Sequence, residues 1–176
     1  MPSLQNNIGF LNTLQSVTPQ ILAETVQQVW QAIVTEWFPG RHGYKWSFHN
    51  TMADATVIQV IALEQNPLTP NDWVERQIFL VECKPPSSDT PTGWDDTIIG
   101  QSRNHLSQAL NPSGRWYAAV AIGLKVRFYQ FDGTVPANQQ LVQLHQGTFD
   151  MSESDGIVQV EDMMSYIKEN GWQWAI

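Results

Sequence analysis

The stretch of sequence that decides the fold is FLVECKPP, which occupies residues 79–86. Its apolar start and its alternating pattern predict a β-strand, on which Glu82 and Lys84 share one face while Cys83 points to the other. Proline cannot donate a ladder hydrogen bond, so Pro85 ends the strand and leaves the charged pair at the rim of the sheet. Charges at the end of a buried strand are costly unless they pair, bind a metal or face a cleft. The stretch therefore predicts either a rim salt bridge or a functional site.

The composition is that of an ordered globular protein. The chain has 176 residues, of which 42% are hydrophobic and 15% are charged, so it can bury a substantial core. We expect one domain over residues 1–176, because no internal repeat or low-complexity linker divides the chain. Within it, 1–17 should form a tail or a short packed arm, 18–132 the core, and 133–176 a C-terminal extension with a final helix.

Charge and cysteine content limit the classes of partner and the compartment. The net charge of −8 argues against a broad basic surface for nucleic acid, but it leaves room for a small basic track. Cys83 is the only cysteine, so no intramolecular disulfide can form and a reducing compartment is expected. The N-terminal residues lack the apolar core of a signal peptide, and no apolar run approaches the roughly 18 residues of a membrane span. We therefore expect an intracellular protein of the cytoplasm or nucleus, without a membrane partner.

Upstream of the deciding stretch, periodicity predicts a helix followed by a hairpin. Apolar residues at steps of three and four predict a helix over Thr18–Trp37, with Thr18 as N-cap and Pro19 at its first position. Alternating segments predict strands over Gly43–Thr51, Asp54–Glu64 and Val74–Lys84, with a loop at Gln65–Asp72. An antiparallel hairpin that folds back near position 68 would bring Asp54 opposite Glu82.

Downstream of it, helices and strands alternate again. We expect a turn-rich loop over Pro85–Gly93 and then a helix over Trp94–Leu110, with Gln101 and His105 on one face. Two strands should follow, over Arg115–Ile122 and Leu124–Phe131, and then an extended edge segment over Leu141–Phe149. A final helix is expected over Val158–Asn170, closed by Gly171. This order predicts an α/β (α+β) fold with a central mixed sheet flanked by helices.

The predicted hairpin gathers groups that suit a metal site. Two carboxylates, from Asp54 and Glu82, would suit a hard divalent cation such as Mg²⁺ or Mn²⁺, which keeps several waters, and the carbonyl of Cys83 could add an oxygen ligand. Lys84 would orient or deprotonate an attacking water, or offset charge on a phosphate. Gln101 on the following helix could position Lys84 or the backbone being cut.

These residues carry a family resemblance. Asp54, followed by Glu82-Cys83-Lys84 after an apolar run, resembles the D…(D/E)-x-K signature of the PD-(D/E)XK nuclease superfamily. With the helix that carries Gln101 and the strand after it, the region 18–132 is similar to the stand-alone restriction-endonuclease-like domains of fungal genomes. Ala53 stands where the superfamily's name has proline, and His105 where relatives often have tyrosine. The resemblance implies an αβββαβ core and, in active members, metal-dependent phosphodiester hydrolysis.

The resemblance also implies an acidic residue from the first helix, for which Glu24 and Glu36 are both open candidates. Two tryptophans near loops, Trp73 and Trp94, are expected to pack at the rim, with base stacking as the alternative.

Three functions follow from this sequence. The first is a metal-dependent nuclease, with DNA favoured over RNA as substrate, in which four basic residues contact phosphates: Arg103, Arg115, Lys125 and Arg127. The second is a catalytically inactive nuclease-fold protein that acts through a protein partner as an interaction or host-directed factor. The third is an unrelated α+β ligand-binding domain in which Glu82 and Lys84 merely pair. The sequence leaves open whether the protein is catalytically active and whether it forms a homodimer.

Overall fold

The structure is a computed structural model that describes residues 1–50, 54–96 and 111–176. The described part contains four α-helices and seven strands. The helices are α1 (Ile8–Gln15), α2 (Ala23–Trp37), α3 (Pro91–Asp95) and α6 (Ser154–Ala175), and the 3-10 turns are η1 (Gly40–His42), η2 (Pro86–Ser88) and η3 (Ala137–Gln139). The strands are β1 (Tyr44–Asn50), β2 (Thr56–Gln65), β3 (Trp73–Lys84), β4 (Arg115–Ile122), β5 (Lys125–Asp132), β6 (Leu141–Gln143) and β7 (Phe149–Asp150). Within these residues, no helix combines the length and the apolar character that crossing a membrane requires.

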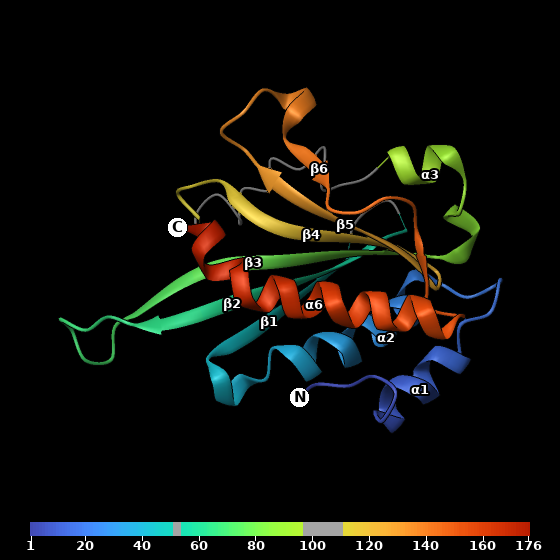
Figure 1. Ribbon diagram of the computed structural model, residues 1–176, viewed down its shortest axis with the longest axis horizontal. Coiled ribbons are helices and arrows are strands. Elements are labelled where there is room, and N and C mark those ends of the chain that lie inside the picture. Colours follow the sequence, from blue (N-terminus) through green and yellow to red (C-terminus); the bar gives the residue numbers. More distant parts are fainter. Residues whose placement is uncertain (51–53, 97–110) are drawn as a thin grey trace.

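All seven strands belong to one mixed sheet, in the order β1-β2-β3-β4-β5-β6, with β7 also paired to β5. Neighbouring strands are antiparallel except β3 and β4, which run parallel. A parallel pair needs a crossover connection, which the chain between Lys84 and Arg115 makes, with α3 as its described helix. Figure 1 shows α2 and α6 lying across one face of the sheet. The expected mixed α/β fold with a central mixed sheet is confirmed.

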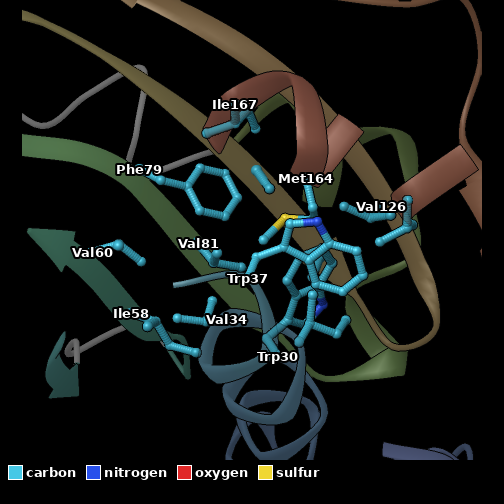
Figure 2. Packing of buried hydrophobic residues seen from close by; sticks show 14 of the residues in the cluster. Trp30, Val34, Trp37, Ile58, Val60, Phe79, Val81, Val126, Met164 and Ile167 are labelled. Atoms are coloured by element: carbon cyan, nitrogen blue, oxygen red, sulfur yellow. The ribbon is translucent and has the colours of Figure 1, made fainter. Parts of the chain in front are cut away.

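The main core lies between the sheet and the two long helices. Figure 2 shows Trp30 and Trp37 of α2, with Met164 and Ile167 of α6, gathered over the sheet residues Ile58, Val60, Phe79 and Val81. None of these side chains is more than 1% exposed. Because side chains alternate along β3, its residues Phe79, Val81 and Cys83 all point to the helices, which makes this face of the strand apolar. Each large side chain fully buried here contributes about 1.5–3 kcal/mol.

The opposite face of the sheet carries a smaller apolar cluster. Its buried members include Leu80 of β3, Val120 of β4 and Trp94 of α3. Glu82 and Lys84 alternate onto this same face, where they too are buried. The charged pair therefore faces away from α2 and α6, toward the side that α3 covers.

The N-terminal residues pack onto the domain. Leu4 and Phe10 are fully buried in the main core, and α1 lies against α2. The predicted helix over Thr18–Trp37 begins later than expected, at Ala23, because Thr18 instead accepts a hydrogen bond from the amide of Ile21 in a turn.

The predicted hairpin pairing was wrong by three residues, since Val57 and not Asp54 lies opposite Glu82. Two physical features produce this offset. The first is the turn, because the pairing of Gln65 with Trp73 places the fold-back one residue later than expected. The second is a β-bulge between Val60 and Ile61, where β3 contains one extra residue.

Two downstream expectations also change, and a third falls mostly outside the described residues. The predicted loop Pro85–Gly93 contains η2 and the start of α3, and of the helix expected over Trp94–Leu110 the residues 97–110 lie outside the described part. Helix α6 does not close at Gly171 but continues to Ala175. A Cβ at Gly171 would lie 3.1 Å from Cβ of Ile78, so glycine there allows close packing of the helix on β3.

Gly156, near the start of α6, provides a stability test in which the helix propensity and the packing oppose each other. A Cβ at this position would lie 1.8 Å from the carbonyl oxygen of Asp150. Although alanine favours a helix over glycine, we expect Gly156→Ala to destabilise the protein by about 1–3 kcal/mol through overpacking. Gly9→Ala in α1, where the nearest atom would be at 3.4 Å, is the control and should be neutral or stabilising. Urea denaturation of both variants checks the prediction, and equal effects would contradict it.

Candidate functional site

The structure buries the Glu82–Lys84 pair at the end of β3. Glu82 is fully buried and Lys84 is 7% exposed. The Lys84 Nζ donates to the carbonyl oxygen of Gly93 at 2.7 Å and to that of Asp96, and it lies 3.6 Å from Glu82 Oε1. The ammonium group is therefore held in one orientation by two backbone carbonyls and one carboxylate.

The loop after β3 folds locally to present these carbonyls. Thr90 is the N-cap of α3, and its Oγ1 accepts a hydrogen bond from the Gly93 amide at 3.0 Å. A Cβ on Gly93 would lie only 1.8 Å from the carbonyl oxygen of Ser88, so this approach of α3 to η2 requires glycine. The segment from Pro85 to Asp96 thus forms a compact cover over Lys84.

Asp54 lies at the same end of the sheet but lines a different cavity. It has a left-handed backbone, with φ of 49°, and borders a cavity of about 490 Å³ together with Thr56, Pro85 and Glu24. Glu82 instead faces the smaller cluster on the other side of the sheet. Continuing the β2–β3 register by one residue would place Ala55, rather than Asp54, beside Lys84. The prediction that Asp54 lies opposite Glu82 is therefore wrong. The two residues lie at the same end of the sheet but have different surroundings.

The two acidic candidates of α2 differ in their surroundings. Glu24 in the first turn lines the same cavity as Asp54. Glu36 accepts a hydrogen bond from Asn7 Nδ2 at 3.1 Å and so helps to hold the N-terminal arm against α2. Position thus associates Glu24, rather than Glu36, with Asp54, a distinction that the sequence left open.

Of the two remaining predicted site residues, only Cys83 belongs to the described part of the chain. The side chain of Cys83 is fully buried in the main core, as expected, and burial raises the pKa of its thiol well above the usual range. The contribution of its carbonyl oxygen to a metal stays a prediction. Gln101 lies outside the described residues.

A second cluster of polar side chains lies on the same face of the sheet as the Glu82–Lys84 pair, around β5, which is two strands away from β3. Its cavity of about 580 Å³ is lined by Asp89, Thr90, Pro91, Trp94, Asp95, Lys125, Arg127, Thr148 and Asp150, and we call it the β5 pocket. The guanidinium carbon of Arg127 lies 4.3 Å from the ring centroid of Trp94, and its Nε donates to Thr148 Oγ1 at 2.7 Å. The sequence suggested Lys125 and Arg127 as phosphate contacts but did not identify Asp89 as their neighbour. Their alternation with Val126 and Phe128 was the signal that they share one face.

A divalent cation needs several oxygen or nitrogen ligands that converge on one point. Among the described residues, no cluster of three or more histidine, cysteine or carboxylate side chains is arranged to hold a metal. Mg²⁺, however, is commonly bound by one or two carboxylates together with waters and substrate phosphates. The carboxylate of Glu82 is an oxygen donor of this kind, and it is fully buried.

Comparison with known proteins adds no further constraint. The chain matches no protein-family model, no curated protein and no solved structure at a significant level.

Proposed function

We propose that this chain is a restriction-endonuclease-like domain that hydrolyses phosphodiester bonds of nucleic acid, with DNA favoured over RNA, in a reaction that depends on Mg²⁺ or Mn²⁺. The observation that carries the proposal is the buried Glu82–Lys84 pair at the end of β3, beside the parallel strand β4. Helix α2, three antiparallel strands, a crossover connection and β4 follow one another in an order that supports the αβββαβ core.

The chemistry assigned to each residue follows from its position. Glu82 would hold the cation, and Lys84 would orient the attacking water or contact the phosphate, since two backbone carbonyls fix the direction of its ammonium group. When bound, a divalent cation supplies Lewis-acid stabilisation of the negative charge that develops on the phosphoryl oxygens. Asp54, which lines the same cavity as Glu24 and not the surroundings of Glu82, stays a predicted second carboxylate, and Gln101 stays a predicted positioning residue.

A second candidate function is favoured by a specific observation. Lys84 already donates to two carbonyls, and Asp54 lines a cavity on the α2 side of the sheet. In a catalytically inactive protein of this fold, the Glu82–Lys84 pair would be structural and the protein would act through a partner protein. The acidic net charge of −8 also suits such a role better than a broad contact with DNA.

Metal titration of the wild-type protein separates the two candidates. If the first holds, Mg²⁺ or Mn²⁺ should raise the melting temperature in a saturable way, because a ligand that binds only the folded state stabilises it. The same ions should support cleavage of plasmid or single-stranded DNA, and EDTA should abolish it. A protein that neither gains stability nor cleaves any tested nucleic acid with either ion would support the inactive alternative.

A further inference from the structure

Asp89 lines the β5 pocket and accepts hydrogen bonds there through both of its carboxylate oxygens. Its Oδ2 accepts a hydrogen bond from Lys125 Nζ at 2.8 Å, and its Oδ1 accepts one from Trp94 Nε1 at 2.9 Å. Two oxygens of one anion therefore meet two donors, as the two non-bridging oxygens of a phosphodiester could. The hydrogen bond from Lys125, and then that from Trp94, lowers the pKa of Asp89, so its carboxylate is charged near neutral pH.

This contact can open at little cost. The side chains of Lys125 and Asp89 are 45% and 35% exposed, and exposed ion pairs contribute little to stability. The pocket also contains the carboxylates of Asp95 and Asp150, so adding an anion without losing one would be unfavourable. Exchanging the charge of Asp89 for the single charge of a phosphodiester leaves the charge of the pocket unchanged.

The β5 pocket lies at a useful distance from the proposed site. Strand register aligns Glu82 with Val120 and Arg127 in one row across β3, β4 and β5, and it aligns Lys84 with Lys125 in the next. In each row the residue of β3 and the residue of β5 are two strand spacings apart, which is about 10 Å. Because each nucleotide advances a strand by at least about 3.4 Å, one nucleic-acid strand can span this separation within about three nucleotides.

We propose that the β5 pocket binds a backbone phosphate of the nucleic-acid strand within about three nucleotides of the bond that is cut, and that Asp89 holds this place in the free protein. The inference rests on the proposed function. The phosphate would displace Asp89 and accept hydrogen bonds from Lys125 and Trp94. Arg127, whose guanidinium carries five N–H donors, would add a further contact from its position over the Trp94 ring.

Binding without cleavage tests this proposal. The anisotropy of a labelled single-stranded oligonucleotide is measured in EDTA over a salt series. We expect Asp89→Asn to bind about tenfold more tightly than wild type, because a competing anion is removed. Lys125→Gln and Arg127→Gln should bind more weakly, and each should reduce the slope of log K against log salt by about one. Lys45→Gln is the matched control, since the Lys45–Glu75 pair has the same exposures of 45% and 35%, and it should bind as wild type does.

A second measurement follows the displacement directly. The indole N–H resonance of Trp94 should move when the oligonucleotide is added to wild type, and it should move less in Lys125→Gln. Unchanged affinity of Asp89→Asn, Lys125→Gln and Arg127→Gln relative to Lys45→Gln would overturn the inference, as would wild-type and Asp89→Asn protein that bind no oligonucleotide. If these variants cleave and their binding is unaltered, the proposal that the β5 pocket binds phosphate is wrong, while the proposed function stands. If the variants alter binding but the wild-type protein shows no metal-dependent cleavage, the proposed nuclease function is wrong, while phosphate binding by the β5 pocket stands.

Discussion

Lys84→Met is expected to lower the rate of cleavage by about 10²–10⁴-fold and, separately, to destabilise the fold by about 3–5 kcal/mol. Removing one partner of a buried ion pair deprives the other charge of that partner's compensation, and such losses are typically of this size. Here the other charge is the fully buried carboxylate of Glu82, which lies 3.6 Å from the ammonium group. Loss of a positioned catalytic group lowers the rate by about 10²–10⁴-fold. Cleavage and urea denaturation, measured on the same preparation, report the two effects.

The double variant Glu82→Gln/Lys84→Met distinguishes catalysis from stability. Because it removes both charges together, it should regain most of the stability that Lys84→Met loses, with a coupling energy of about 2 kcal/mol or more. Its cleavage should nevertheless stay low, since neither proposed catalytic group remains. A double variant that is stable and still cleaves as wild type does would show that the reaction occurs elsewhere on the protein. Additive losses of stability would mean that the two groups do not interact as their distance indicates.

The strands could be predicted from the sequence because alternation is a local property. Phe79, Val81 and Cys83 were assigned to one face and Glu82 and Lys84 to the other, and the structure places them so. The pairing between strands was not predictable in the same way. A bulge between Val60 and Ile61 and a turn displaced by one residue are each small, yet together they move the partner of Glu82 from Asp54 to Val57.

The surroundings of the candidate site were harder to predict than its members. Glycine and proline in Pro85–Gly93 indicated a loop, and that composition carries no information about where the loop's carbonyls point. The carbonyls of Gly93 and Asp96 reach Lys84 because α3 packs closely on η2, a tertiary contact. The same contact brings Asp89 to Lys125, which is distant in the sequence and was expected only to contact phosphate.

Asn111 has a structural role that its place in the sequence did not indicate. Asn111 directly follows the segment 94–110, for which the sequence predicted a helix, and it precedes a proline. In the structure its side chain is 1% exposed and forms hydrogen bonds to three backbone groups. Oδ1 accepts from the Gln77 amide at 2.7 Å, while Nδ2 donates to the carbonyl of Gln77 at 2.6 Å and to that of Arg115 at 2.7 Å. The amide thus takes the place of a strand partner for β3, just before the ladder with β4 begins at Phe79.

Asn111→Ala is therefore expected to destabilise the protein by about 3 kcal/mol or more. Each buried backbone group that loses its partner costs about 1–3 kcal/mol, although such costs do not add fully. Asn111→Asp should be at least as damaging, because it keeps the acceptor, loses the donor and buries a charge opposite the carbonyl of Gln77. These losses would appear as a lower urea midpoint with an unchanged m-value.

The matched control for this prediction is Asn66→Ala. Asn66 also bonds the backbone, accepting from the Leu68 amide at 3.0 Å, but it does so in the exposed turn between β2 and β3. Water can replace its hydrogen bonds, so its loss should cost about 1 kcal/mol or less. Equal effects of Asn66→Ala and Asn111→Ala would refute the view that the Asn111 amide completes the sheet. A large difference would locate the stability of the β3–β4 junction, and hence of the strand that presents Glu82 and Lys84, in this one side chain.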